Sequence, residues 1–372
     1  MSNEGILAVK ATAPKYLKGA SDQTVRQRIL LTMLQSRGRL QFNTDGHTEQ
    51  NWLIQVRDPQ IKQYGDSARQ TFTEHDAYEQ MQIDLRGYIG TDKLSHRTAL
   101  VNKGKMAIVN HYDTKLEILM RSAKRRLGSD LYADGYAAGY EQSLIGLGSF
   151  MKPDASVATD DQVAVPASTA LYGGKSVQLG TFGGSWSSNM DVSPSSVVAN
   201  DWPFGSGSSE YDALTPKMLN ANSTKWASGT AGWKNNCSTM MRYARLWARS
   251  LGGDGSEPML HLLSTEFYGQ YADYQEAKER VILPHAPSAD YGFSQTINFE
   301  GAAVTFDYDV PSSKGYGLNI DEMMLFTLHP DLFESEGPEW STEEQAWLFV
   351  VRMVGNLRFN PKHHVEYGYY GS

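Results

Sequence analysis

The chain has 372 residues, 40% of them hydrophobic and 20% charged, and carries a formal net charge of −8. This length exceeds what one compact core usually holds, so we expect two or three lobes, and the acidic balance argues against a general nucleic-acid-binding protein, which carries a basic excess or stripe. The single cysteine, Cys237, excludes an intrachain disulfide and a cysteine-rich zinc site, while the absence of a signal peptide and of a ~20-residue apolar run predicts a soluble protein made in the cytoplasm.

The N-terminal region is predicted to be an extended arm followed by a helix. Residues 1–21 mix small and polar side chains without a sustained period. A helix then begins near Ser21 and ends near Gly38, because apolar residues recur there at helical spacing. The residues that share its apolar face are Val25, Ile29, Leu30, Met33 and Leu34.

Residues 39–104 have the pattern of a long two-stranded excursion. Apolar residues alternate with polar ones along two segments, which contain Trp52, Ile54 and Val56 in the first and Met81, Ile83, Leu85 and Tyr88 in the second. A polar stretch, residues 60–70, forms the predicted tip. Because an isolated hairpin is only marginally stable, this excursion must lie against its own chain or against a neighbouring subunit.

A long amphipathic helix, hereafter the spine helix, is predicted from Lys105 to about Leu131. Its apolar residues follow each other in steps of three and four, and they are Val109, Tyr112, Leu116, Leu119, Ala123 and Leu127. At ~1.5 Å per residue the helix is roughly 40 Å long. The basic run of Lys124, Arg125 and Arg126 is either a solvated helix face or a contact with nucleic acid.

The remaining chain alternates Gly-rich segments with shorter elements. A helix is predicted from Ser238 to Gly252, with an apolar face of Met241, Ala244, Leu246, Trp247 and Leu251. Another helix is predicted at residues 266–279. Strands are predicted at residues 259–264, at 292–310 as a pair, at 316–319, at 323–328, and at 348–354 with a turn at Gly355-Asn356 into 357–359.

No motif in the chain carries a convincing catalytic, cofactor-binding or metal-binding pattern, and no enzyme activity is predicted. Gly173 to Ser176 lack the first glycine and the following helix of a phosphate loop. Ser185 lacks the spacing of a nucleophile turn. His363 and His364 are adjacent and point apart on a strand, so surface histidines are the simpler interpretation. Cys237 is interpreted as a structural thiol.

Four tryptophans, Trp186, Trp202, Trp226 and Trp233, fall in the Gly- and Ser-rich region. Tryptophans in such a region occur in sugar-binding platforms, but packing in a core or an interface is the simpler account.

The order of these elements resembles that of the major capsid proteins of tailed bacteriophages, whose fold was first seen in phage Hong Kong 97. The closest local resemblance covers Ile83 to Gly135, with the turn Asn102-Lys103-Gly104 before the spine helix. Further matching segments are Leu171-Tyr172-Gly173-Gly174, Phe299 to Val304, and Tyr316 to Asn319. The resemblance runs along nearly the whole chain and rests on the ordered set of segments.

The resemblance implies an α+β, Hong Kong 97-like capsid fold and a head protein that self-assembles, as pentamers and hexamers, into an icosahedral shell around double-stranded DNA. It implies an N-terminal arm at residues 1–45, an extended loop at 46–103, a peripheral domain with the spine helix at 104–145 and 326–372, and an axial domain at 146–325. The loop contacts between subunits are expected at Trp52, Ile54, Val56, Tyr64, Met81, Ile83, Leu85 and Tyr88. The DNA-facing side chains are expected at Lys124, Arg125 and Arg126.

The expected partners are further copies of the chain, a portal, a separate scaffolding protein, a decoration protein, and packaged DNA held by weak contacts. A separate scaffold is expected because Met1 leads almost at once into the arm, without a long helical segment before it. Neither Lys62 nor Lys93 aligns with the crosslinking lysine of some family members, so no crosslink is predicted. No cofactor and no membrane contact are expected.

Two alternative functions remain open at the level of the sequence. A polysaccharide-acting hydrolase would use the aromatic, Gly-rich lobe and would need two carboxylates that converge in a cleft. A tail-tube or decoration protein of a phage is the other alternative, although such proteins are usually shorter and lack a long helix after a strand arm.

Overall fold

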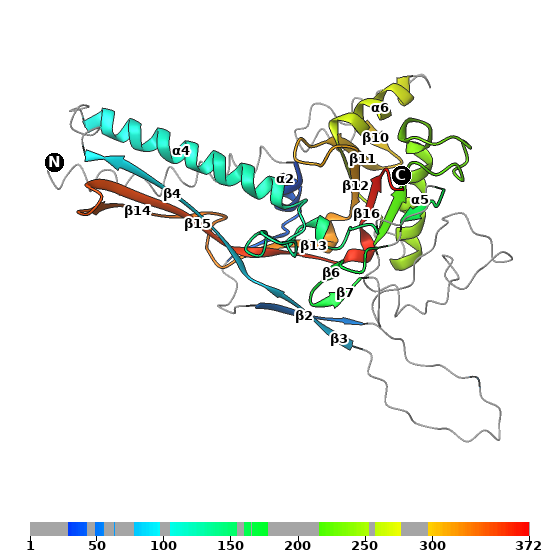
Figure 1. Cartoon of the computed structure of the whole chain (residues 1–372), viewed down its shortest axis with the longest axis horizontal. Helices are drawn as coiled ribbons and strands as arrows, with labels where there is room; N and C mark the ends of the chain where they lie inside the picture. Colours follow the sequence, from blue (N-terminus) through cyan, green and yellow to red (C-terminus); the bar gives the residue numbers. More distant parts are fainter. Residues whose placement is uncertain are drawn as a thin grey trace. The chain divides into compact units, whose positions relative to one another are not determined.

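The computed structural model describes residues 29–42, 49–55, 63, 78–96, 105–154, 160–164, 166–177, 216–252, 257–276 and 297–371. The contacts within the chain divide it into two compact units. Unit 1 comprises residues 1–48, 84–147 and 323–358, and unit 2 comprises residues 49–83, 148–322 and 359–372. Each unit combines helices with a sheet (Figure 1), so the predicted α+β class is confirmed.

Unit 1 is built on a five-stranded sheet. The long strand β15 pairs with β14 and with β4, both antiparallel, and β1 runs parallel to β13. The strands are β1 (Leu40–Gln41), β4 (Arg86–Ser95), β13 (Met323–Thr327), β14 (Glu334–Ser341) and β15 (Ala346–Phe359). The buried side chains of β15, among them Phe349, Val351 and Met353, form part of its core.

The predicted turn at Gly355-Asn356 is wrong, because β15 continues through both residues. A Cβ atom on Gly355 would lie 2.1 Å from the carbonyl oxygen of Phe326, so the glycine allows close approach of a neighbouring strand. The buried Asn356 side chain accepts hydrogen bonds from the backbone N–H groups of Ile145 and Leu357. Gly355 and Asn356, whose residue types are typical of a turn, therefore lie inside a strand, where the glycine allows close packing and the asparagine satisfies backbone N–H groups.

Two helices belong to unit 1. Helix α2 (Ile29–Ser36) buries Leu30, Leu31, Met33 and Leu34, and Gly38 follows it with a φ of +64°, as a C-terminal glycine cap does. The predicted helix is confirmed from Ile29 to its end, whereas its predicted start near Ser21 and Val25 lie outside the described residues. Helix α4 (Lys105–Asp130) is the predicted spine helix, and Figure 1 shows it lying along β4.

Unit 2 is built on a mixed seven-stranded sheet with the order β10-β11-β9-β12-β16-β8-β5. The strands β8, β9 and β16 are buried along their whole length, so they lie between two covered faces. The bounds are β5 (Val163–Ala164), β8 (Lys217–Asn220), β9 (Leu260–Leu263), β10 (Ile297–Phe299), β11 (Ala302–Phe306), β12 (Lys314–Leu318) and β16 (Val365–Gly368).

Helices α5 (Trp233–Gly252) and α6 (Thr265–Glu276) pack together in unit 2. Trp233 stacks on Phe267 with ring centroids 4.6 Å apart, and both rings lie in the core that also holds Cys237 and Trp226. The structural interpretation of Cys237 and the core interpretation of these two tryptophans are therefore confirmed. Trp186 and Trp202 lie outside the described residues.

The predicted apolar face of α5 includes Leu246, but the side chain of Leu246 is exposed. The buried face of α5 instead consists of Met240, Met241, Ala244, Trp247 and Ala248.

Two short hairpins complete unit 2. Strand β2 (Glu49–Gln55) pairs with β3 (Tyr78–Asp84), and β6 (Leu171–Tyr172) pairs with β7 (Lys175–Ser176). Gly173 and Gly174 form the turn of the second hairpin with φ angles of +56° and +76°, so the rejected phosphate loop is a hairpin turn. The return strand of the predicted excursion is shorter than expected, since β4 belongs to the sheet of unit 1.

The histidine pair is placed differently from the prediction. His363 ends the short 3₁₀ helix η5 (Pro361–His363), which joins β15 to β16, and both His363 and His364 are buried. Burial lowers the pKa of His364 from 6.5 to about 3. The expected surface histidines are thus core residues, and the rings of Phe150 and Phe359 lie 6.4 Å and 5.8 Å from that of His364.

The predicted peripheral segment 326–372 is divided between the units, since residues 326–358 belong to unit 1 and β16 pairs in the sheet of unit 2. The four predicted domains are proposals that this division by contacts does not test. Among the described residues, no helix combines the length and the apolar character needed to cross a bilayer.

Candidate assembly site

The middle of the spine helix is seated on β4 through one buried stripe. Leu116 and Leu127 are buried as predicted, and Met120 joins them, whereas Leu119 is half-buried. A Cβ atom on Gly90 of β4 would lie 2.9 Å from Cδ1 of Leu119, so the glycine makes room for the helix. Ala123 is half-buried, and the side chains of Val109 and Tyr112 lie outside the described residues. The predicted helical stripe is therefore present in the described part of α4.

A hydrogen-bond network, hereafter the clasp, joins the C-terminal end of α4 to β4. The hydroxyl of Tyr88 donates to Oδ2 of Asp130 at 2.7 Å and accepts from the backbone N–H of Leu144 at 2.8 Å. Nε of Arg126 also donates to Oδ2 of Asp130, at 2.8 Å. Burial raises the pKa of Tyr88 well above its ordinary value, and the Asp130 carboxylate adds to this effect, although the hydrogen bond from the Leu144 N–H partly opposes it. The phenol therefore stays protonated and continues to donate.

Arg86 holds the loop that follows the spine helix. Its guanidinium is buried and donates to the carbonyl oxygens of Gly135 and Ser143. It also lies 5.5 Å from the ring centre of Tyr136. Because a buried guanidinium is stable only when its donors are satisfied, this loop, β4 and the end of α4 behave as one block within unit 1.

The predicted DNA-facing run is distributed over different surroundings. Lys124 is buried within the subunit, which contradicts its predicted exposure to packaged DNA. Arg126 is engaged by Asp130 and lies over the ring of Tyr140 at 5.6 Å. Arg125 is exposed. Successive side chains of a helix point in different directions around its axis, so these three residues do not form one basic patch.

The apolar residues of the β2–β3 arm pack largely inside unit 2. Met81 and Ile83 are buried, and a Cβ atom on Gly173 would lie 2.4 Å from Cε of Met81. Trp52 is half-buried, with its ring 6.2 Å from that of Tyr172. The predicted contacts with other subunits are therefore wrong for Met81 and Ile83, which are already covered by their own chain.

The other predicted loop residues fall in three groups. Ile54 and Leu85 are half-buried, and Tyr88 belongs to the clasp. Val56 and Tyr64 lie outside the described residues.

The sequence pattern did not single out Leu53 and Tyr78, which are 67% and 58% exposed. Leu53 lies between Trp52 and Ile54, and three successive apolar residues on a strand cannot all face one side, which is the signal that identifies it.

The described residues contain no group of three histidine, cysteine, aspartate or glutamate side chains arranged to hold a metal ion.

Comparison with known proteins gives no match to a protein-family model and none to a curated sequence. Solved structures do match. The cyanophage A-1(L) capsid asymmetric unit superposes with a TM-score of 0.55 at 12% identity, over 91% of this chain and 93% of that one. The chain has the fold of phage capsid proteins.

Two further structures support this capsid fold. The capsid of Myoviridae phage XM1 matches with a TM-score of 0.52 at 10% identity, over 91% of this chain and 92% of that one. The capsid of a native GTA particle matches with a TM-score of 0.51 at 10% identity, over 91% and 90% of the two chains. The predicted resemblance to a phage capsid fold is confirmed.

Proposed function

We propose that this chain is the major capsid protein of a tailed phage and assembles into an icosahedral shell that encloses double-stranded DNA. The observation that carries the proposal is the capsid fold, which extends over 91% of this chain and 93% of the cyanophage A-1(L) capsid chain. The role proposed is structural.

Exposed apolar side chains supply the physical basis for assembly. A shell requires each subunit to make several different contacts with its copies, and contacts that close by rotation produce rings. Five large apolar side chains are more than half exposed in the described residues, namely Leu53, Tyr78, Ile89, Ile118 and Tyr308. They are distributed over both units, as expected for a subunit with several neighbours. Obligate interfaces bury roughly 2,000–5,000 Å², and apolar burial stabilises by ~25 cal/mol per Å² before ordering costs.

Each domain proposed from the sequence has its own role in this shell. The axial domain would gather at five- and six-fold axes, and the peripheral domain with α4 would form the wall between them. The arm and loop would overlap neighbouring subunits. The polar tip at residues 60–70 would reorient as the shell expands, which electron cryomicroscopy of the procapsid and of the mature shell would show.

The partners in this proposal are further copies of the chain, a portal and a separate scaffolding protein, with a decoration protein as an additional candidate. Packaged DNA would be held only weakly, consistent with the net charge of −8. Assembly would take place in the host cytoplasm and the product would be the virion head.

Size-exclusion chromatography with negative-stain microscopy of the overexpressed full chain tests the proposal. Closed shells, hexamers or pentamers support it. A monomer that releases reducing sugar from a polysaccharide would establish the hydrolase alternative, and tubes would establish a tail protein. Deleting residues 60–70 should leave the subunit folded and prevent stable shells, so wild-type assembly of the deletion variant would contradict the interlocking role of the loop.

A further inference from the structure

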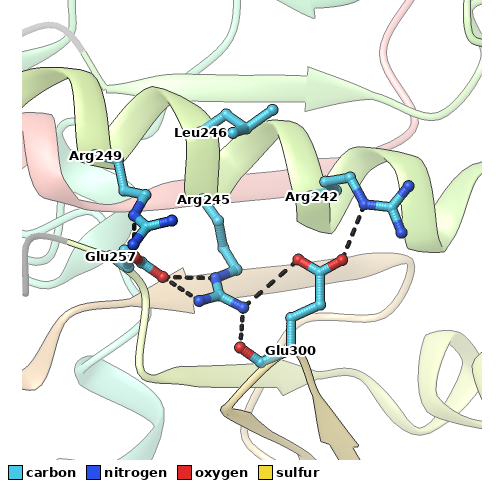
Figure 2. Close-up of a pocket in the computed structure, with 6 residues that line it drawn as sticks. All are labelled: Arg242, Arg245, Leu246, Arg249, Glu257 and Glu300. Atoms are coloured by element: carbon cyan, nitrogen blue, oxygen red, sulfur yellow. Dashed lines mark hydrogen bonds and ion pairs between the residues drawn. The ribbon is translucent and has the colours of Figure 1, made fainter. Parts of the chain in front are cut away.

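One face of α5 carries a row of three arginines. Arg242, Arg245, Leu246 and Arg249 follow each other at helical spacing and form one stripe, hereafter the arginine row. Glu257, which precedes β9, and Glu300, in the turn between β10 and β11, lie against this stripe (Figure 2). Together the six residues line a pocket of about 270 Å³.

The two carboxylates and three guanidiniums alternate in a continuous chain of ion pairs. Nε of Arg242 lies 2.9 Å from Oε1 of Glu300, whose Oε2 lies 3.5 Å from Nη1 of Arg245. Nε of Arg245 lies 2.8 Å from Oε2 of Glu257, and Nε of Arg249 lies 2.5 Å from Oε1 of the same carboxylate. Each glutamate therefore pairs with two arginines, which joins the three guanidiniums in one network.

Exposure separates the floor of the pocket from its rim. The side chains of Arg245 and Glu257 are only 17% and 14% exposed, whereas those of Arg242 and Arg249 are 56% and 51% exposed. Leu246 is 49% exposed and lies between the two outer arginines on the helix. Three cations face two anions, so the six residues keep a net positive charge, and the exposed Leu246 projects from the helix away from the two glutamates (Figure 2).

This chemistry favours a carboxylate-bearing protein surface over nucleic acid. Glu257 and Glu300 neutralise two of the three arginines, so the single remaining positive charge suits one carboxylate better than the closely spaced phosphates of DNA. Leu246 offers nothing to a phosphate but can pack on the methylene groups of a glutamate side chain. Arginine is enriched in protein–protein contacts and among their hot spots.

A second copy of this chain supplies the complementary surface. The chain is acidic overall, with a net charge of −8. Its exposed acidic side chains include Glu339 at the end of β14 and Glu343 in the turn after it. An acidic chain that assembles with itself needs positive patches where its copies meet, because like charges at a contact oppose association.

We propose that the arginine row is a docking site for an acidic surface of a second copy of this chain, with a carboxylate of that copy bound by the exposed guanidinium of Arg242 or Arg249. The inference rests on the proposed shell function and adds to it the position and the chemistry of one contact between subunits. A contact of this kind weakens as ionic strength rises, because its outer arginines are solvent-exposed.

Site-directed photocrosslinking in assembled particles tests the contact directly. A photoreactive benzoylphenylalanine in place of Leu246 should give an adduct with a second copy, whose attachment site mass spectrometry maps next to an acidic residue. Particles that form and yield no such adduct, or yield an adduct with DNA, overturn the inference and leave the shell function intact. Wild-type chain that forms no particles overturns the shell function instead.

A variant pair with a matched control supplies the second test. The double variant Arg242→Ala/Arg249→Ala should keep the unfolding midpoint of the unassembled subunit and lower the yield of particles by about tenfold or more, the effect of losing one ordinary interface hot spot. Lys234→Ala removes an exposed cation from the same helix, where Lys234 pairs with Asp273 at 3.2 Å, and should assemble as the wild type does. Equal particle yields for the double variant and the wild type, at both low and high salt, would refute the docking site.

Discussion

Truncating Leu116 on the spine helix tests how α4 is held. The side chain is 0% exposed, whereas Ile118, two residues further along the same helix, is 54% exposed. Leu116→Ala removes buried methyl groups and leaves a cavity, which costs about 2–5 kcal/mol. Ile118→Ala removes a side chain of the same size from the surface and should change the free energy of unfolding by about 0.5 kcal/mol or less.

Urea denaturation of unassembled subunits, followed by circular dichroism, measures the difference. With a slope of about 2–3 kcal/mol per molar urea, a loss of 3 kcal/mol lowers the midpoint for Leu116→Ala by about 1–1.5 M, and Ile118→Ala should leave it nearly unchanged. Equal effects of the two substitutions would refute the assignment of the buried face. The harsher Leu116→Asp places a charge in that face, so we expect insoluble or unassembled protein, and normal shells from that variant would contradict the seating of α4.

Three further predictions test the clasp, a strand contact and a buried histidine. Tyr88→Phe removes the hydroxyl that links Asp130 to the Leu144 N–H, and should cost about 1–3 kcal/mol in urea unfolding, while Tyr78→Phe, at an exposed tyrosine, should cost almost nothing. Gly355→Ala forces a Cβ to within 2.1 Å of the Phe326 carbonyl and should lower the melting temperature sharply, whereas Gly269→Ala, in helix α6, meets no neighbour within 4 Å and should not lower it. Burial lowers the pKa of His261 from 6.5 to about 3, so below about pH 6 the unfolded chain takes up a proton that the folded chain does not. The free energy of unfolding therefore falls by ~1.4 kcal/mol for each pH unit below about pH 6. His261→Gln should reduce this pH dependence by one proton, and an unchanged slope would show that His261 is not buried in its neutral form.

The helices could be predicted from the sequence because each has a buried stripe with helical spacing. The fold buries residues that recur at helical spacing, and this spacing of apolar residues can be read from the sequence. These residues are Leu116, Met120 and Leu127 of α4 and Met240, Ala244 and Trp247 of α5.

Strand β14 could not be predicted, since Glu334, Glu336 and Glu339 are exposed and Gly337-Pro338 interrupt it. An edge strand without a buried face leaves no alternation to detect.

Buried polar groups could not be predicted, because their partners come from distant parts of the chain. Lys217 is fully buried in β8, with its ammonium 4.2 Å from the ring centre of Trp247 on α5. Lys124 and His364 are likewise charged or polar residues whose sequence neighbours resemble those of surface positions. Local sequence reports which residues can be exposed, whereas burial depends on what the fold brings over them.

In the β2–β3 arm, the face that is buried within unit 2 is the one that the sequence analysis assigns to contacts with other subunits, and this limits how the arm can contribute to a shell. Alternation along the strands was predicted to supply apolar residues to neighbours, yet Met81 and Ile83 are covered within unit 2. On strands, the side chains between the buried ones point the other way, and Leu53 and Tyr78 are the exposed apolar residues that the described part of the arm offers. In the proposed shell, contacts between this arm and other copies would therefore use Leu53 and Tyr78, while Met81 would hold the arm to the turn at Gly173 of its own chain. A subunit that fixes one face of its arm internally keeps that arm in a defined position before assembly, which lowers the ordering cost of each contact that the shell adds.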